Sequence, residues 1–131
     1  MAWTNSKIFR ITLANSLGNV TALDLDADSF KLANYNNSIT PDQNVTAANT
    51  AYNVGQWASA NEVSQGGQWA AGGIAIGSTV LDVSTNGIVM FDGADVASGS
   101  AATLSNVYGG LVYDDTLTTP VADQGLCYLY Y

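Results

Sequence analysis

The sequence predicts a mainly β protein: a single-domain antiparallel β-sandwich or flattened barrel with one N-terminal helix. Several short, apolar, β-prone runs are separated by turn residues, and only one segment carries clear helix signals. The strongest turn is Asn86-Gly87, which lies between two such runs and predicts a tight hairpin. The chain has 131 residues, of which 47% are apolar, and neither a linker nor an internal repeat divides it. Residues 1–131 are therefore predicted to form one domain.

The predicted helix covers about residues 5–17. Residues 4–6 are Thr, Asn and Ser, which cap helix N-termini, and Gly18 lies where a left-handed C-cap belongs. Apolar residues recur between these ends at four-residue spacing: Phe9, Leu13 and Leu17. The alternative is a strand over Ile8–Leu13, because that run is also β-prone. The two end signals favour the helix.

Strands are predicted from about residue 29 to the end of the chain. The expected strands are Ser29–Tyr35, Thr79–Val83, Ile88–Phe91, Val107–Tyr113 and Leu126–Tyr131. Alternation in the first strand places Phe30 and Leu32 on the face opposite to Tyr35. The last two strands form a hairpin, and the final strand is rich in tyrosine. Because an unpaired aromatic edge invites aggregation, we expect this strand to lie between other strands or under a partner subunit.

The charge balance limits the classes of partner. The chain has 3 Lys+Arg against 11 Asp+Glu and a net charge of −8. Binding to nucleic acid or to an anionic membrane requires clustered basic side chains, so neither partner is expected. No basic segment followed by an apolar run opens the sequence, so we expect no signal peptide and folding in a cytoplasm. Cys127 is the only cysteine and is expected to be a buried free thiol.

Asp24, Asp26 and Asp28 have the spacing that opens a calcium loop. A loop of this kind counted from Asp24 needs glycine at position 29 and glutamate at position 35, where this chain has Ser29 and Tyr35. We therefore interpret the segment as a connector with solvated carboxylates. No metal and no cofactor are predicted.

The sequence offers little for catalysis. It contains no histidine, so Ser-His-Asp and Cys-His arrangements are ruled out. Glu62 could pair with an aspartate in a cleft for general acid–base chemistry, but a solvated Glu62 is the simpler interpretation. No catalytic residue is predicted, and the chain is not expected to be an enzyme.

Aromatic residues are the remaining candidates for a functional surface. In a β domain they usually lie in the core or at a subunit interface, although an exposed stripe of them can bind sugars. Six are predicted to lie at an interface: Trp3, Trp57, Trp69, Tyr113, Tyr130 and Tyr131. Only 11% of the residues are charged, so few charged side chains are available to keep the aromatic terminal strand soluble if it is exposed. We therefore expect an oligomer.

Four regions of the chain match one family in the same order. They are Ser29–Asp42, Glu62–Ser64 together with Trp69–Gly73, Phe91–Val96, and Tyr108–Asp115. With these regions the sequence resembles a family of small virion structural proteins of tailed bacteriophages, particularly those that infect actinobacteria. Relatives often carry Tyr-Thr-Ala-Gly-Gly where this chain has Trp69–Gly73. The resemblance covers nearly all of Phe9–Tyr131.

The resemblance implies a non-enzymatic capsid decoration (cementing) protein on the outer capsid surface of the virion, assembled in the host cytoplasm. Its partners would be the major capsid protein and further copies of this chain, with which it would form a homotrimer. With so few basic residues, attachment is expected to use loop-borne aromatics, including Trp3, Trp57 or Trp69, rather than charge pairing. The alternative is a receptor- or carbohydrate-binding module of a tail or head fibre, which would present its tryptophans in an exposed groove.

Overall fold

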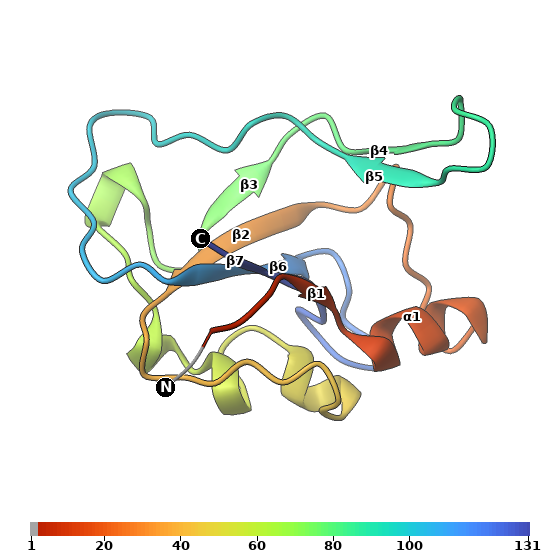
Figure 1. Ribbon diagram of the computed structural model, residues 1–131, viewed down its shortest axis with the longest axis horizontal. Coiled ribbons are helices and arrows are strands. Elements are labelled where there is room, and N and C mark those ends of the chain that lie inside the picture. Colours follow the sequence, from red (N-terminus) through yellow and green to blue (C-terminus); the bar gives the residue numbers. More distant parts are fainter. Residues whose placement is uncertain (1–2) are drawn as a thin grey trace.

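The computed structural model describes residues 3–131 and is mainly β (Figure 1). A five-stranded antiparallel sheet has the order β1-β7-β6-β2-β3, and β4 and β5 form a separate two-stranded sheet. The elements are β1 (Lys7–Ile8), α1 (Arg10–Leu17), β2 (Phe30–Tyr35), β3 (Ile74–Ile76), β4 (Val80–Asp82), β5 (Met90–Asp92), β6 (Gly109–Asp114) and β7 (Gly125–Tyr130). Four 3₁₀ turns follow β2: η1 (Ala47–Thr50), η2 (Gly55–Trp57), η3 (Ser59–Asn61) and η4 (Gly66–Gln68).

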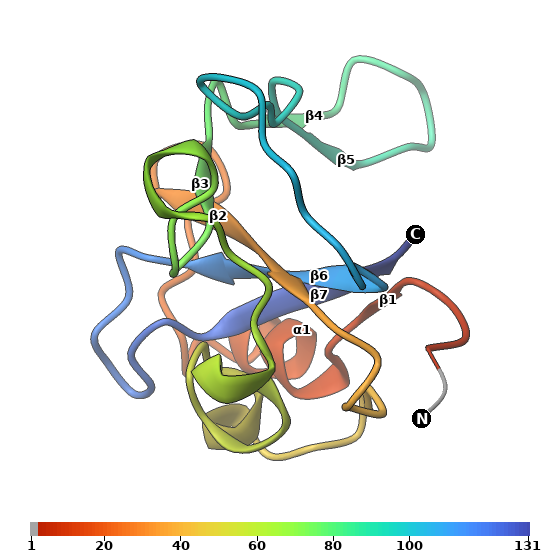
Figure 2. The ribbon, with the colours of Figure 1, turned by 90° about the vertical axis from the view of Figure 1, so that its left-hand side faces the viewer.

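The prediction of a mainly β chain with a short N-terminal helix is confirmed, whereas neither a closed barrel nor a full sandwich forms within residues 3–131. The second sheet has only two strands. Residues 93–108 cross one side of the molecule without forming a strand (Figure 2). This segment is rich in alanine, serine and glycine, which provide little side chain to pack on a pleated surface. The second layer is therefore mostly irregular connection.

The terminal strand is the best example of a confirmed prediction. β7 lies between β6 and β1, with Tyr128 opposite Leu111 on one side and opposite Lys7 on the other. Its backbone groups are thus paired on both sides over the part that β1 covers. The hairpin predicted at Asn86-Gly87 is also present, but β4 and β5 are shorter than predicted and residues 83–89 form a longer connection between them.

Both faces of the main sheet are covered, and the alternation predicted for β2 is confirmed. Ala33 and Tyr35 belong to one buried cluster, and Phe30 and Leu32 belong to the other. Figures 1 and 2 show α1, η1, η2 and η3 on the first side, and β4, β5, η4 and residues 93–108 on the second side. The sheet is therefore the central layer of the molecule.

The N-terminal helix is shorter than predicted. Lys7 and Ile8 pair with β7 instead of joining the helix, and the N–H of Phe9 donates to the carbonyl of Leu126 at 3.1 Å. α1 then begins at Arg10 without a side-chain cap. Pairing with the terminal strand thus overrides the local cap signals. The strand interpretation holds for Lys7–Ile8, and the helix interpretation holds for Arg10–Leu17. Gly18 ends the helix as expected, but its φ of −83° is not left-handed.

Candidate functional site

Four of the six predicted interface residues lie in the interior of the single chain. Trp57 is fully buried and meets Trp3 edge-on, with ring centroids 5.9 Å apart. Trp69 and Tyr113 are also buried. In this conformation the four side chains provide core packing and offer almost no surface to a partner, because the 3₁₀ turns and the loops around them fold over the sheet. The expectation that a tryptophan reaches out to a capsid does not fit their position.

The other two predicted residues, Tyr130 and Tyr131, are exposed. The N–H of Tyr131 donates to the carbonyl of Tyr108 at 3.2 Å, so a third exposed tyrosine adjoins them. We call Tyr108, Tyr130 and Tyr131 the tyrosine patch. Beside it lies an open groove of about 310 Å³, lined by Asn36, Asn37, Ser38, Asn106 and Tyr108. This is a surface with amide groups and phenol rings and no charged side chain in its lining.

The largest exposed apolar surface lies on residues 80–92, the β4–β5 hairpin, which we call the hairpin arm. Six large side chains on it are exposed: Val80, Leu81, Val83, Ile88, Val89 and Met90. The most exposed of them, Val89, has 70% of its surface in solvent. Figure 1 shows the arm extending along the top of the molecule to a turn that projects beyond the main sheet. Contiguous exposed apolar surface of this kind typically marks a contact with another protein.

The inner face of the arm is fixed to the rest of the chain. Phe91 packs on Phe30 of β2 with ring centroids 5.1 Å apart, and Leu81 lies opposite Phe91 in the ladder. The carboxylate of Asp26 accepts a hydrogen bond from the N–H of Leu81. The base of the arm is thus held by one aromatic contact and by the loop that contains Asp26.

Sequence reasoning located the arm but missed its exposure. Residues 88–91 are Ile, Val, Met and Phe, four apolar residues in succession. Because a strand turns successive side chains to opposite faces, such a run next to a tight turn cannot bury all of them against a single sheet. This absence of alternation was the available signal.

A second apolar surface lies on α1. Thr12 is the buried residue of the helix, whereas Leu13 and Leu17 face solvent, and Leu17 has 81% of its surface exposed. Arg10 lies three residues before Leu13, on the same side of the helix. We call Arg10, Leu13 and Leu17 the helix stripe. Of the three residues with four-residue spacing in the sequence, only Phe9 is buried. Leu13 and Leu17 lie on the solvent-exposed face of the helix.

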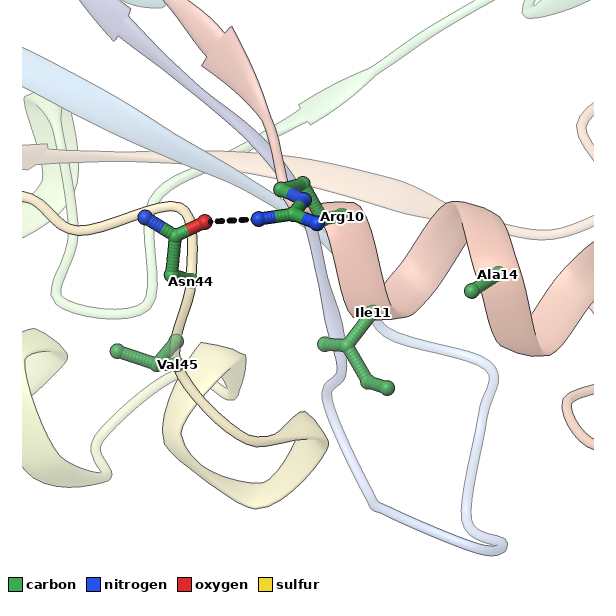
Figure 3. Close-up of a pocket in the computed structure, with 5 residues that line it drawn as sticks. All are labelled: Arg10, Ile11, Ala14, Asn44 and Val45. Carbon is green, nitrogen blue, oxygen red and sulfur yellow. Dashed lines mark hydrogen bonds between the residues drawn. The ribbon is translucent and has the colours of Figure 1, made fainter.

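An open groove of about 460 Å³ runs beside this stripe and is lined by Arg10, Ile11, Ala14, Asn44 and Val45 (Figure 3). Arg10 donates from its guanidinium to the side-chain oxygen of Asn44 at 2.8 Å across one end of it. The apolar members of the lining come from both the helix and the facing loop. The groove is open to solvent and could accept a side chain from another molecule.

Glu62 has partners that differ from those of an acid–base pair. One carboxylate oxygen accepts the hydroxyl of Tyr52 and the other accepts the N–H of Gly72, each at 2.7 Å. Burial, and then the bond to Glu62, raise the pKa of Tyr52 to about 12. Tyr52 in turn stacks on Tyr113, with ring centroids 5.0 Å apart. Glu62 therefore ties the loop at Gly72 to the buried aromatic cluster.

The aspartates of residues 24–28 bind backbone groups. One oxygen of Asp24 accepts the N–H groups of Asp26 and Ala27, and Asp28 accepts the N–H of Asp24 at 2.7 Å. No group of three or more acidic, cysteine or histidine side chains within residues 3–131 is arranged to hold a metal ion. The carboxylates close a turn in the connector between α1 and β2.

Asp114, at the end of β6, is a fully buried carboxyl group. One of its oxygens accepts the N–H groups of Thr116 and Leu117. Burial raises the pKa of Asp114 to about 6; the neighbouring carboxyl of Asp28 adds to the rise, whereas the N–H of Thr116 opposes it. A protonated Asp114 therefore suits the fold better than an ionised one.

Comparisons of this chain with protein families, with curated proteins and with solved structures find no match. None of the helices in the described part of the chain is long and apolar enough to cross a membrane. Interpretation of the function therefore rests on the surfaces described above and on the sequence resemblance.

Proposed function

We propose that this chain is a non-enzymatic structural protein of a tailed-bacteriophage virion, and that it decorates the outer surface of the head and stabilises the shell. The observation that carries the proposal is the hairpin arm, whose six exposed apolar side chains favour a protein that works through contacts with other proteins. The sequence resemblance supplies the particular assembly, a capsid with its major capsid protein as partner.

The charge distribution supports attachment that does not depend on ion pairs. The chain has only three basic residues, and one of them, Lys31, already pairs with Asp115 at 2.8 Å. Exposed ion pairs contribute only about 0–1 kcal/mol each, so a few of them would not hold a protein on a shell. Desolvated aromatic side chains contribute more at interfaces, and Tyr130 and Tyr131 are both exposed. We place the capsid contact at the tyrosine patch.

The test is cosedimentation of the purified chain with empty capsids at low and high salt. We expect binding that persists at high salt and falls when Tyr130 and Tyr131 are both replaced by alanine. Ser105→Ala, a change at an exposed position of the irregular connection, is the control for a surface substitution. Binding that collapses as salt rises, or that is unchanged in the double tyrosine variant, would contradict this mode of attachment.

The second candidate is a receptor- or carbohydrate-binding module. Trp3, Trp57 and Trp69 are buried, so they do not form the exposed groove that this class was expected to use. The groove at the tyrosine patch favours it instead, because asparagine amides beside a tyrosine ring can bind sugar hydroxyls. Binding to host cell-wall glycans together with no binding to capsids would favour this candidate over decoration.

A further inference from the structure

The hairpin arm and the helix stripe have complementary chemistry. Residues 80–95 contain three aspartates and no basic residue, whereas residues 7–20 contain Lys7 and Arg10 and no acidic residue. Both segments also carry exposed apolar side chains. The whole chain has a net charge of −8, but the segment at α1 is basic. An acidic and apolar surface such as the arm therefore finds charge complementarity at this segment.

The outward face of the arm carries both kinds of group. Asp92 lies opposite Val80, and Asp82 lies opposite Met90. Because directly opposed residues share one face of a ladder, these four residues form the face away from Phe91 and the main sheet. The backbone N–H and the side-chain O–H of Ser84 both donate to the carboxylate of Asp82 and lower its pKa, so this carboxylate stays ionised at neutral pH.

The helix stripe has a basic residue, Arg10, at the N-terminal end of α1, where the helix dipole disfavours positive charge. Arg10 is the first residue of α1, and the first turn contains no acidic side chain. The positive end of the helix dipole favours acidic groups at this position, so the cation of Arg10 is placed unfavourably with respect to the helix. Within residues 3–131 the one ion pair is Lys31–Asp115, so Arg10 has a hydrogen bond to Asn44 but no carboxylate partner in its own chain.

The arm cannot reach the helix of its own chain. In both views the main sheet lies between the arm and α1 (Figures 1 and 2). Phe91 on the arm side and Phe9 on the helix side belong to separate clusters on its two faces. The contact that the two surfaces suit is therefore one between two molecules.

We propose that the outward face of the hairpin arm docks on the helix stripe of a second copy of this chain, with Asp82 and Asp92 beside Arg10. The apolar side chains of the arm then cover Leu13 and Leu17, and the groove at Arg10 and Val45 receives one of them. Each copy gives its arm to one neighbour and its helix to another. A head-to-tail contact gives a closed ring or an open chain of copies, according to the rotation between neighbours, and the homotrimer that the resemblance implies is the closed ring of three.

This inference deepens the proposed function by naming the contact between copies, and it is measured without capsids. The test compares the self-association of the wild-type chain with Arg10→Glu, Asp92→Arg and the double variant, by sedimentation equilibrium over a range of concentrations. Each single change places like charges together, so we expect association to weaken about tenfold or more. The double variant restores one pair of opposite charges at positions 10 and 92, with the signs exchanged, while Asp82 remains acidic, so we expect its association to recover in part.

Leu17→Ser tests the apolar part of the contact, and Val54→Ser is its matched control at an exposed apolar residue outside it. We expect weaker association for Leu17→Ser and wild-type association for Val54→Ser, with the melting temperature of the dilute chain unchanged in both. A monomeric wild-type chain at all concentrations, single charge variants that associate normally, or a double variant that does not recover would each overturn the proposal. A wild-type chain that self-associates but does not bind capsids would instead count against the proposed function.

Discussion

The main sheet and the hairpin arm are both antiparallel β-structure, but they are stabilised differently. β2 and β6 pair along six residues each, and buried side chains cover both faces of their sheet. β4 and β5 pair along three residues each and leave most of their large side chains in solvent. A two-stranded hairpin is marginally stable alone in water. The sheet therefore stabilises the fold, whereas the apolar surface of the arm is available to a partner.

The largest expected difference between the two regions comes from two glycines with similar backbone conformations. Gly73, beside β2, has a φ of +82°, and Gly87, in the turn of the arm, has a φ of +78°. A Cβ on Gly73 would collide with the backbone at Leu32, whereas nothing lies within 4 Å of a Cβ on Gly87. We expect Gly73→Ala to lower the free energy of unfolding by about 3–5 kcal/mol, from strain and overpacking together.

Gly87→Ala is the matched variant, because it introduces the backbone strain without the collision. We expect it to leave the unfolding free energy of the main sheet within about 0.5 kcal/mol of wild type, since the strain is confined to the arm. Urea denaturation followed by tryptophan fluorescence reports on the sheet, because all three tryptophans lie outside the arm. Equal losses of stability in the two variants would show that the arm and the sheet unfold as one unit.

The same comparison explains how far the sequence could predict the structure. Three strands of the sheet, β2, β6 and β7, and the turn of the arm follow from alternation and from Asn86-Gly87, which are local signals, whereas β3 in the glycine-rich stretch was not predicted. β1 and the shortened helix do not follow, because Lys7 and Ile8 pair with a strand more than a hundred residues away. The buried position of Trp57 depends likewise on loops that fold over the sheet, which no local pattern describes.

The candidate surfaces were predicted only in part. The exposed Tyr130 and Tyr131 were named from the aromatic terminal strand, but the helix stripe was not recognised. Four-residue spacing identifies one side of a helix without saying which side meets the core. In α1 a threonine, Thr12, fills the buried position because its hydroxyl donates to the carbonyl of Gly125 at 2.6 Å.

The next largest effect is a pH dependence that has opposite signs in the two regions. The pKa of Asp114 is raised from 3.8 to about 6, so its contribution to stability is complete below about pH 4 and is lost as the pH rises through 6. Asp114→Asn keeps an oxygen for the N–H groups of Thr116 and Leu117. We expect this variant to be more stable than wild type at pH 7.5, by about 2 kcal/mol, and to lose this advantage at pH 4.

Asp82 in the arm provides the contrast. Hydrogen bonds from Ser84 lower its pKa, so its contribution is present at neutral pH and is lost as the pH falls through its lowered value. We expect Asp82→Asn to leave the melting temperature of the main sheet unchanged at both pH 4 and pH 7.5. A stability difference for Asp114→Asn that is the same at both pH values would rule out titration of this group as its cause.

A smaller effect is expected from a buried hydroxyl in the sheet. Tyr35 donates to the carbonyl of Trp57 at 2.7 Å, and that carbonyl also accepts the N–H of Asn53. We expect Tyr35→Phe to cost about 1 kcal/mol in the free energy of unfolding, because the carbonyl keeps one partner. Tyr130→Phe, at an exposed tyrosine, should cost nothing measurable. A similar cost in both variants would contradict the role given to the buried bond.

The smallest effect concerns the connector that holds the base of the arm. The oxygens of Asp24, Asp26 and Asp28 accept backbone N–H groups, including that of Leu81 in the arm. We expect a chelator to leave the melting temperature of the chain unchanged, because these bonds need no ion. A fall of several degrees, reversed by added calcium, would show that a metal holds this connector.

The central claim is that the hairpin arm docks on a second copy of the chain, and hydrogen exchange of the intact chain tests it most directly. Exchange of the amides in residues 80–92 is compared with that in β6 and β7 at low and at high protein concentration. We predict that exchange in the arm slows as the concentration rises, while exchange in β6 and β7 does not change. Exchange in the arm that is the same at every concentration would contradict the claim.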